Sequence, residues 1–469
     1  MSLIMKFGGT SVADAAAISR VVDIVSRERE RRGFAPVAVV SAMSGVTDQL
    51  LALSRHAAAG DRAAVERGWE ELRAKHVHAL HGLAPHRPDV RQAVEDELEQ
   101  LRSTLAAACI LREASPRAAD AIAACGELIS SRIVAAAFGD GAIWVDARRV
   151  MATDGTHGSA NPAMAGLHKS AAEELIPVLE RGLVPVVGGY VGRAPDGATT
   201  TLGRGGSDYS AALIAAALHD VRSTDGADLP RTEIQIWTDV DGMLTADPRI
   251  VPDARCVPQL SFGEASELAY FGAKVLHPST ILPAVDRDIP VRILNSRKPD
   301  GAGTVIVSRP SHRDEPLAAI ACKRNITVVE VTSTRMLMAH GFLRRLFEVF
   351  ERHRTAVDVV TTSEVSVSVT VDDDRRVGEI AAELSSVGEV KVEPGMAILC
   401  TVGDGLRQDP CAAVRVLASL EGLPLRIVSQ SSSRRNVTVV LDEANLASAM
   451  RRLHAAWFGA ADTPMDAIA

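Results

Sequence analysis

The sequence predicts an α/β protein with a mostly parallel central sheet covered by helices on both faces, followed by two smaller ferredoxin-like βαββαβ modules. Three observations lead to this class. Short apolar runs alternate with helical periodicity through residues 1–309, which is typical of parallel sheets. The composition changes at 308–316 (SRPSHRDEP), a segment typical of a linker. Beyond it, residues 357–373 and 425–443 resemble each other, and a helical segment precedes and follows each copy.

Strands and helices alternate along the first region. Apolar runs predict strands at 2–7, 36–40, 142–146, 183–188, 233–238, 291–295 and 304–308. Periodicity predicts helices at 13–31, across most of 49–138 with a break at 82–85, and at 170–181, 209–218 and 262–271. In the second region, helices are expected at 341–354 and 411–420, each ahead of one strand-rich copy. The expected domains are therefore 1–309, 317–392 and 393–469, with strand exchange between the last two left open.

The composition argues against several classes of protein. The chain has 469 residues, a net charge of −8 and only 3% aromatic residues, which argues against a nucleic-acid-binding surface. The first residues, MSLIMKFGG, lack a basic segment followed by a long apolar run, so no signal peptide is expected. No apolar run reaches about 18 residues, so no membrane span is expected either. The 6 cysteines form no C-x-x-C pair, which favours reduced thiols and a cytoplasmic protein. The histidines at 56, 76, 78, 81 and 86 offer no convincing metal set and are expected at the surface.

One stretch, TTLGRGGSDYSAAL at 200–213, combines a glycine-rich loop with the start of a helix. Backbone N–H groups and the positive end of a helix dipole then meet at one point, where anions are stabilised. Arg204 offers a planar fork suited to a substrate carboxylate, and Asp208 lies in the first helical turn. A glycine turn ahead of a core helix is the structural alternative.

Further charged and hydroxyl residues follow the predicted strands. Lys6 lies at the end of the strand 2–7, just before Gly8 and Gly9, where open α/β sheets bind ligands. It either neutralises a phosphate or extends from the strand end into solvent. Ser41 and Thr47 bring hydroxyl groups to the loop after the strand 36–40, where Thr47 could also cap a helix.

Charges also lie inside an apolar helix and in a turn. Glu127 lies within the apolar run AIAACGELISSRIVAAAF, so it needs either a buried cation or a ligand ammonium as partner. Residues 239–249 combine aspartates with Arg249. Arg249 is a candidate phosphate contact, and a turn with solvated aspartates is the alternative interpretation. Lys274 is a second isolated lysine beside a glycine.

These segments occur in an order that resembles a known family. They are KFGGTSV (6–12), SAMSGVTD (41–48), CGE (125–127), LGRGGSD (202–208), WTDVDG with DPR (237–249) and FGAKVLHP (271–278). Together they resemble the aspartate kinases, members of the amino acid kinase fold, in particular the monofunctional lysine-sensitive type. The C-terminal pair resembles tandem ACT domains. The resemblance covers essentially the whole chain and implies ATP- and Mg²⁺-dependent phosphorylation of L-aspartate to 4-phospho-L-aspartate, which begins lysine, threonine and methionine biosynthesis.

The resemblance also assigns roles to residues that match the family's motifs. It implies Lys6 and Asp208 as catalytic residues, Ser41, Thr47, Glu127 and Arg204 as aspartate-binding residues, and Lys6, Gly8, Gly9, Thr238, Asp239, Leu244, Arg249 and Lys274 as nucleotide-binding residues. It assigns no metal-ligating residue. The family often has tyrosine where this chain has Leu244, so an adenine or ribose contact there is open. The reaction suits these residues, because a carboxylate nucleophile needs no general base, whereas two anions must be neutralised and aligned.

An effector site in the ACT pair is a further implication of the resemblance. Its residues are Met336, Gly341, Phe342, Leu343, Val357, Asp358, Thr362, Ser363 and Glu364. Asp358 and Glu364 offer anionic partners for a diamino acid such as lysine, while capping and turn formation are the structural alternative. Ala356 replaces a serine seen in some lysine-sensitive members, so threonine or no effector stays open. ACT modules commonly pair between chains, which implies a homodimer or a tetramer.

Two rival functions remain. A kinase for another amino acid, such as glutamate, would share KFGG but is not expected to carry GRGGSD, KVLHP and the repeat together. A non-catalytic amino-acid sensor would use the ACT pair alone, whereas this chain has the lysine, arginine and aspartate set intact.

Overall fold

The computed structural model describes residues 1–223, 232–272, 277–311, 313, 315–336 and 340–459. The chain divides into two compact units, Met1–Met243 with Val275–Arg309, and Leu244–Lys274 with Pro310–Ala469. The second unit therefore includes a segment that precedes the expected linker by tens of residues. The domain boundaries expected from the sequence, at 309, 317–392 and 393–469, stay a prediction.

The first unit contains the α/β region. Its strands are β1 (Ser2–Phe7), β2 (Val37–Val40), β3 (Ala142–Val145), β4 (Val184–Gly188), β5 (Val191–Arg193), β6 (Thr199–Thr201), β7 (Thr232–Thr238), β9 (Val291–Asn295) and β10 (Thr304–Val307). Its α-helices are α1 (Ala15–Arg32), α2 (Val46–Ala58), α3 (Arg62–Leu83), α4 (Pro88–Leu111), α5 (Pro116–Ala137), α6 (Ala147–Val150), α7 (Met164–Ser170), α8 (Ile176–Glu180), α9 (Gly206–Ser223) and α11 (Leu282–Val285). A π-helical turn, Ala171–Leu175, joins α7 to α8.

The strands of this unit follow the order β3-β4-β2-β1-β7-β9-β10. All neighbouring pairs up to β9 are parallel, and β10 is antiparallel to β9. Strands β5 and β6 form a separate antiparallel hairpin. The mostly parallel sheet expected from the sequence is confirmed. Because the central strands run in one direction, the carboxyl ends of β1, β2, β4 and β7 lie along one edge, where such sheets bind ligands.

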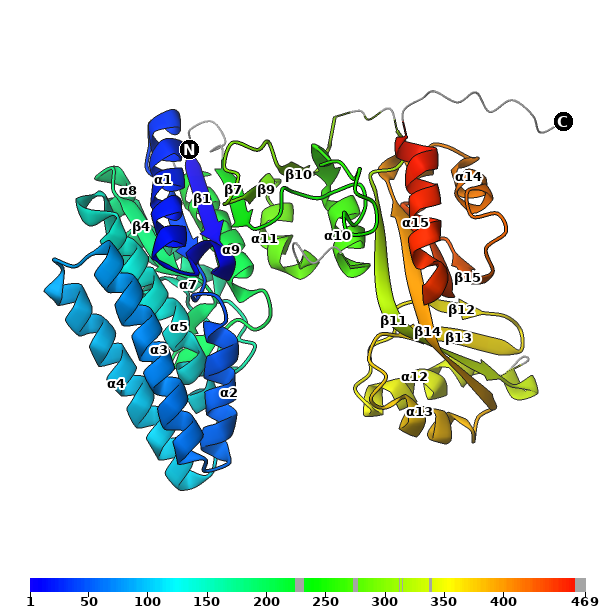
Figure 1. Ribbon diagram of the computed structural model, residues 1–469, viewed down its shortest axis with the longest axis horizontal. Coiled ribbons are helices and arrows are strands. Elements are labelled where there is room, and N and C mark those ends of the chain that lie inside the picture. The colour runs from blue at the N-terminus through cyan, green and yellow to red at the C-terminus, as the bar shows by residue number, and fades with distance from the viewer. Residues whose placement is uncertain (224–231, 273–276, 312, 314, 337–339, 460–469) are drawn as a thin grey trace. The chain divides into compact units, whose positions relative to one another are not determined.

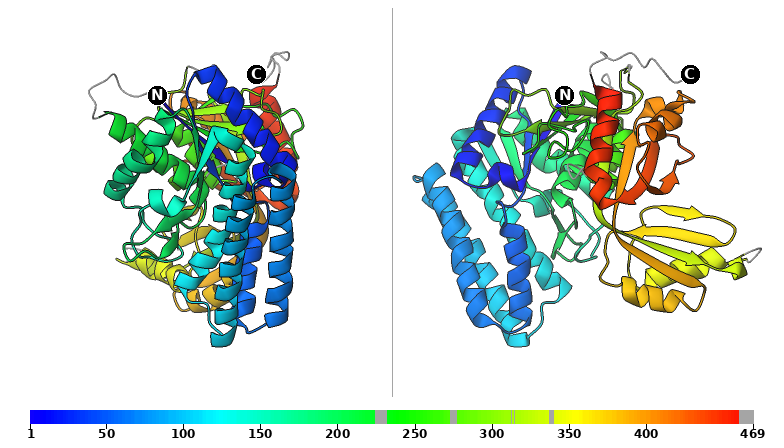
Figure 2. Two further views of the ribbon diagram at one scale, coloured as in Figure 1. Left: turned by 90° about the vertical axis from the view of Figure 1, so that its left-hand side faces the viewer. Right: turned by 45° about the vertical axis from the view of Figure 1, so that its right-hand side comes forward.

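Helices cover both faces of the sheet. Side chains alternate along β1, so that Leu3, Met5 and Phe7 enter a core that also contains apolar residues of α1 to α5. Figures 1 and 2 show α2 to α5 as long helices running side by side. Lys6 points to the opposite face, where α9 packs against β1, β2 and β7. The pleat of β1 thus directs one lysine toward α9.

One histidine differs from the expectation. His76 is buried, with 1% of its surface exposed, whereas the sequence placed it at the surface. Its Nδ1 lies 2.7 Å from the carbonyl oxygen of Leu72, one turn earlier in α3, whereas no partner among the described residues reaches its Nε2. Burial lowers the pKa of His76 to about 4. The histidines at 56, 78, 81 and 86 are exposed, as expected.

The second unit contains the repeated region. Its strands are β8 (Gln259–Ser261), β11 (Ala319–Thr332), β12 (Val360–Thr362), β13 (Ser366–Val371), β14 (Glu389–Val402), β15 (Leu425–Ser429) and β16 (Asn436–Asp442). Its α-helices are α10 (Phe262–Tyr270), α12 (Phe342–Arg352), α13 (Val377–Leu384), α14 (Ala412–Ala418) and α15 (Glu443–Phe458).

The two strand-rich copies share one antiparallel sheet in the order β12-β13-β11-β14-β16-β15. The long strands β11 and β14 pair from Ala319 opposite Val402 to Thr332 opposite Glu389, so they run through both halves. Each half has its own apolar core, one beneath α12 and α13, the other beneath α14 and α15. Each copy seen in the sequence is a pair of strands, β12 with β13 and β15 with β16.

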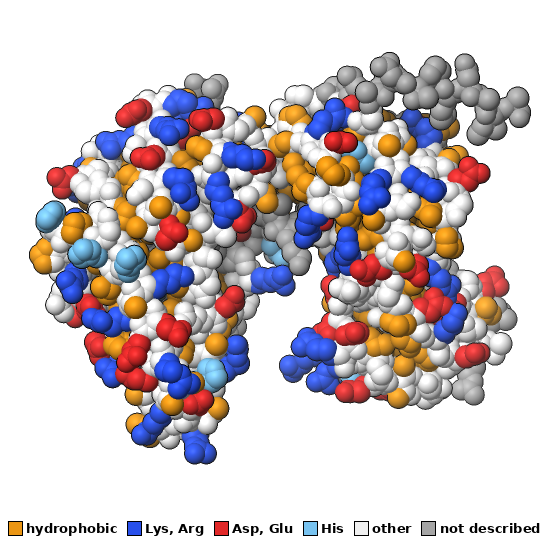
Figure 3. Space-filling model, in the orientation of Figure 1, with side chains coloured by type: hydrophobic (Ala, Val, Ile, Leu, Met, Phe, Trp, Pro, Cys, Tyr) orange, Lys and Arg blue, Asp and Glu red, His pale blue; other side chains and the backbone are white. Residues whose placement is uncertain are grey.

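The surface shows no large field of one charge on the visible face of either unit, where acidic and basic side chains are interspersed (Figure 3). Among the described residues, no helix combines the length and apolar character needed to cross a bilayer. The cysteines at 109, 125, 256, 322, 400 and 411, all within the described ranges, form no disulfide.

Candidate active site

Backbone hydrogen bonds join the ends of the central strands. The N–H of Gly8 donates to the carbonyl of Trp237 at 3.0 Å, and the N–H of Ser41 donates to that of Phe7 at 3.1 Å. The N–H of Gly189 donates to the carbonyl of Val40 at 2.8 Å. The loops after β1, β2, β4 and β7 are thereby fixed to one another. Lys6, Gly8, Gly9, Ser41 and Thr238, which the sequence assigned to the site, lie at this edge.

Lys6 forms an ion pair with Asp208. Its Nζ lies 2.7 Å from Oδ1 of Asp208, and the two side chains are 10% and 15% exposed. Asp208 lies in the first turn of α9, and a Cβ at Gly8 would lie 3.7 Å from the Lys6 nitrogen. The structure therefore brings together two of the predicted catalytic residues. A cation held in this way has a fixed position, and it lies directly beside the glycines of the first strand loop.

The loop that carries Arg204 depends on two glycines. Gly203 and Gly205 have φ of +74° and +71°, in the left-handed region where other residues are strained. Between them, Arg204 is exposed, and it has no ion-pair or hydrogen-bond partner in the part of the chain that the structure describes. The guanidinium is thus free to bind an incoming anion.

Glu127 is buried in α5, with 3% of its surface exposed. Burial raises its pKa to about 8, although a backbone hydrogen bond from Ala42 acts in the opposite direction. Among the described residues, no donor reaches its Oε2. The expected alternative, a buried ion pair within the protein, is therefore absent from the described chain. A buried carboxyl with an unsatisfied oxygen can accept an ammonium group from a ligand.

Ser41 and Thr47, which the sequence assigned to aspartate binding, occupy the loop after β2 and the start of α2. The carbonyl of Ser41 accepts a hydrogen bond from the hydroxyl of Ser130 at 2.8 Å, which ties this loop to α5. Thr47 lies in the first turn of α2 and is partly exposed. Both residues thus lie on loops attached to the edge that holds Lys6.

The residues assigned to the nucleotide divide between the two units. Thr238 and Asp239 end β7 in the first unit, where the Thr238 hydroxyl donates to Asp239 at 3.3 Å. Leu244 and Arg249 belong to the second unit. The guanidinium of Arg249 forms an ion pair with Asp247 at 2.7 Å, and this contact raises its pKa. Lys274 lies outside the described residues.

Comparison with known proteins identifies the family. A model of the amino acid kinase family matches residues 1–295, and an ACT domain model matches residues 399–457. Lysine-sensitive aspartokinase 3 of Escherichia coli is 36% identical over 470 residues, covering 97% of this chain and 99% of that protein. The chain belongs to the aspartokinase family. The expected family, fold class and enzyme class, aspartate kinase, are confirmed.

Other relatives of this aspartokinase agree. Aspartokinase 2, chloroplastic, of Arabidopsis thaliana is 35% identical, covering 98% of this chain and 84% of that protein. The crystal structure of E. coli aspartokinase III in complex with lysine and aspartate matches with a TM-score of 0.82 at 35% identity, covering 97% of this chain and 99% of that one. The same protein in complex with aspartate and ADP matches with a TM-score of 0.79 at 35% identity, over 98% and 100% of the chains.

The effector residues assigned from the sequence lie on two segments of the second unit. Gly341, with φ of +77°, precedes α12, where Phe342 is buried and Leu343 exposed. Thr362 ends β12, and Ser363 and Glu364 lie in the turn that leads to β13; all three residues are exposed. Met336 packs against the core of this half. Asp358, which the sequence assigned with Glu364 as an anionic partner for the effector, follows Val357 and lies two residues before β12.

Asp358 of this aspartokinase already has a cationic partner. Nζ of Lys323 lies 2.6 Å from Oδ1 of Asp358 and 3.1 Å from Oδ2 of Asp372. The Tyr270 hydroxyl donates to the carbonyl of Val357 at 3.4 Å, and burial raises the pKa of Tyr270 to about 12. Sequence reasoning did not find Lys323 or Tyr270, because nothing in their local sequence distinguishes them from a surface lysine and a core tyrosine.

Two residues of the first unit also escaped sequence reasoning. Tyr190 follows Gly189 after the end of β4, with φ of +66°. Burial raises its pKa, and the nearby carboxylates of Glu127 and Asp120 act in the same direction. The glycine pair before Tyr190 repeats the pattern after β1 and could have marked a third strand-end loop. Asp120, seven residues before Glu127 in an apolar helix, carried a comparable signal.

Proposed function

We propose that this aspartokinase transfers the γ-phosphoryl group of ATP to the β-carboxylate of L-aspartate, which yields 4-phospho-L-aspartate and ADP. The observation that carries the proposal is the fixed Lys6–Asp208 pair at the carboxyl end of β1, beside Gly8. The E. coli relative, whose crystal structure is a complex with aspartate and ADP, supports the choice of reactants.

The amino-acid substrate has groups that match the candidate residues. Arg204 is suited to the α-carboxylate, because a guanidinium binds a carboxylate through two parallel hydrogen bonds. Glu127 would accept the α-ammonium group at its unsatisfied Oε2. Ser41 and Thr47 would donate their hydroxyl groups to the substrate's oxygens. The β-carboxylate is then directed toward Lys6.

The phosphoryl transfer itself needs neutralisation of charge between two anions. The nucleophile is already a carboxylate, so no group has to remove a proton from it. Lys6 would stabilise the charge that develops on the transferred group, and the N–H groups around Gly8 and Gly9 would bind phosphate oxygens. Asp208 keeps the Lys6 ammonium in place, which avoids reorganisation during the reaction.

The nucleotide would be bound by Thr238, Asp239, Leu244, Arg249 and Lys274. Mg²⁺ supplies further charge neutralisation when bound, and it usually relies on substrate phosphates with one or two carboxylates rather than a protein cage. No cluster of three or more potential ligands occurs in the described ranges, which fits a metal that enters with the nucleotide. Asp239, exposed at the end of β7, would be its protein ligand.

An amino-acid effector, lysine in the first instance, would regulate the enzyme at the second unit. The proposed site comprises Met336, Gly341, Phe342, Leu343, Val357, Asp358, Thr362, Ser363 and Glu364. The E. coli relative is named lysine-sensitive and has been crystallised with lysine, which supports this effector.

The cellular setting and the assembly are further parts of this proposal. We place the enzyme in the cytoplasm, at the first step of lysine, threonine and methionine biosynthesis. A homodimer or tetramer formed through the ACT domains is the proposed assembly, since β12 and β15 are edge strands and an edge strand can pair with another chain.

The experiment that tests the function is ADP release with aspartate as acceptor, compared with glutamate. Trapping the product with hydroxylamine distinguishes an acyl phosphate from simple ATP hydrolysis. Lysine, threonine, methionine and S-adenosylmethionine are then added in turn. Aspartate-dependent ADP release that lysine inhibits is the expected result. ADP release that does not depend on aspartate would refute the reaction, and inhibition by threonine alone would refute the effector.

A further inference from the structure

Helix α5 carries two buried carboxyl groups, Asp120 and Glu127, and each has 3% of its surface exposed. They are seven residues apart, about two helical turns, so both lie on the same side of the helix about 10 Å apart along its axis. Glu127 belongs to the candidate substrate site. Asp120 has no part in the proposed function described above, although a buried carboxylate is costly unless it is well satisfied.

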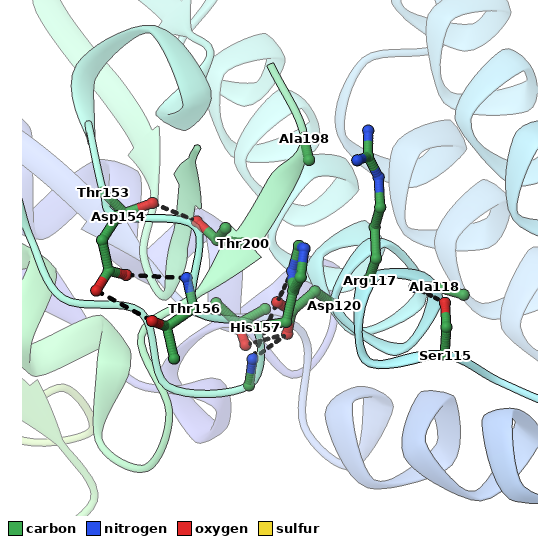
Figure 4. A network of polar contacts seen from close by, with 12 residues as sticks. Ser115, Arg117, Ala118, Asp120, Thr153, Asp154, Thr156, His157, Ala198 and Thr200 are labelled. Atoms are coloured by element: carbon green, nitrogen blue, oxygen red, sulfur yellow. Dashed lines mark hydrogen bonds and ion pairs between the residues drawn. The ribbon is translucent and has the colours of Figure 1, made fainter. Parts of the chain in front are cut away.

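Asp120 is satisfied by three donors. The hydroxyl of Thr201 donates to Oδ1 at 2.6 Å, and the N–H of Gly158 lies 3.1 Å from Oδ1 and 3.0 Å from Oδ2. Nδ1 of His157 lies 2.7 Å from Oδ2. Figure 4 shows Asp120 and His157 pointing toward one another from helix and loop. One side chain on α5 therefore holds two separate segments of the chain.

Both segments border the loop that presents Arg204. Thr201 ends β6, directly before the loop, and its carbonyl accepts a hydrogen bond from the N–H of Ala160 at 2.8 Å. On the other side, a Cβ at Gly203 would lie 3.3 Å from the carbonyl oxygen of Gly158. Gly203, the residue before Arg204, thus packs against the segment that Asp120 holds at Gly158.

We propose that Asp120 is a positioning residue for the amino-acid substrate, acting through Thr201 and Gly158 to fix the loop from which Arg204 extends. Helix α5 then fixes the distance between Glu127 and Arg204, the two residues proposed to bind the substrate. It carries Glu127 itself, and two turns earlier Asp120 holds the Arg204 loop. This inference rests on the proposed roles of Glu127 and Arg204. Charge-assisted hydrogen bonds in a buried site are well suited to such a task, because they keep donors in one geometry.

The variant Asp120→Asn tests the inference. A carboxamide has the same shape but only one acceptor oxygen, so it cannot satisfy the donors of Thr201, Gly158 and His157 together. We expect kcat/KM for aspartate to fall by about 10- to 100-fold, the range for a misplacement near 1 Å, with KM for ATP within about twofold of wild type. A lower melting temperature with unchanged kcat/KM for aspartate would mean a purely structural role and would overturn the inference.

A matched control is available on the same helix and hairpin. Arg117 of α5 forms an ion pair with Asp196 at 2.8 Å, and their side chains are 60% and 59% exposed. Asp196→Asn removes a link between the same elements outside the Arg204 loop, so it is expected to leave all kinetic constants unchanged. An equal loss in Asp196→Asn would show that any weakening of the hairpin suffices, which would contradict a specific role for Asp120.

A double-mutant cycle separates the inference from the proposed function. If Asp120 acts through Arg204, Asp120→Asn adds little to the loss already caused by Arg204→Met. Full additivity would overturn the inference and leave the reaction intact. A wild-type KM for aspartate in Arg204→Met would overturn the substrate role of the loop, and the inference with it. If Asp120→Asn fails to fold, Thr201→Val replaces it. This variant removes one of the three donors, and a smaller fall in kcat/KM for aspartate is expected.

Discussion

Glu127 provides the sharpest quantitative prediction, because its buried carboxyl must lose a proton before it can bind an ammonium group. Its pKa of about 8 means that the free enzyme carries mostly the neutral form at pH 7. Deprotonation at pH 7 then costs about 1.4 kcal/mol, the equivalent of one pKa unit. Removal of one partner of a buried ion pair costs about 3 kcal/mol at the lower end of the usual range. Glu127→Gln keeps the shape of the side chain but not its charge. It should therefore weaken aspartate binding by the ion-pair energy minus the deprotonation cost.

The expected loss in kcat/KM for aspartate is about 1.6 kcal/mol, or roughly 15-fold, at pH 7 and about 3 kcal/mol, or roughly 150-fold, at pH 9. In the wild type, kcat/KM should rise with pH up to about 8 and then level off, because this ratio reports ionisations of the free enzyme. The variant should lack this rise. The assay is aspartate-dependent ADP release between pH 6 and pH 9, with Glu99→Gln, an exposed residue of α4, as control.

The same carboxyl makes a prediction about stability. Its folded-state pKa is raised, so the folded state binds the proton more tightly than the unfolded state does, and its contribution is fully present below about pH 4. That contribution is lost as the pH rises toward 8. Glu127→Gln should therefore unfold at a higher temperature than the wild type at pH 8. Wild-type activity of Glu127→Gln at pH 9, or a wild-type profile without a step near pH 8, would refute the reasoning.

Two further predictions concern the packing that positions Asp208 and the effector site. A Cβ at Gly189 would lie 2.8 Å from the Cα of Ser207, the residue before Asp208. Gly189→Ala should therefore displace the start of α9 by overpacking and lower kcat at least about 10-fold. Gly155→Ala is the control and should leave kcat unchanged, because no atom would lie within 4 Å of its Cβ. Unchanged kcat in Gly189→Ala would contradict a fixed position for Asp208. Lys323→Met should free Asp358 and lower the half-inhibitory lysine concentration about 10-fold, with Arg344→Met, an exposed residue of α12, as control. Weaker inhibition in Lys323→Met would show that Lys323 belongs to the effector site rather than competing with it.

The fold was predictable from the sequence because its signals are local. Short apolar runs predicted β1, β2 and β4 to within one residue, since a buried parallel strand needs apolar side chains on both faces. Helix α9 begins at Gly206, three residues before the expected start, because the glycines of its loop enter the first turn. The sharing of one sheet by both C-terminal repeats was not predictable, since it depends on pairing of β11 with β14 across about 70 residues.

The candidate site was predictable only where a motif carried it. Lys6 and Asp208 lie in separate motifs, and their 2.7 Å contact follows from the pleat of β1 and the position of α9. By contrast, Asp120 and Lys323 act through partners that are distant in sequence, Thr201 and Asp358. Sequence periodicity describes which face of an element a residue occupies, but it does not identify the partner that the tertiary structure brings to that face. The burial of His76 was missed for the same reason.

The central claim is that a fixed cation at the end of β1 allows two anionic reactants to meet. Single-turnover phosphoryl transfer by Lys6→Ala tests it most directly, with bound aspartate and ATP measured separately and Lys169→Met, an exposed lysine, as control. Loss of one preorganised charge should slow transfer by at least about 100-fold, while the folded state and aspartate binding are retained. A folded Lys6→Ala enzyme that transfers the phosphoryl group at the wild-type rate would contradict the claim.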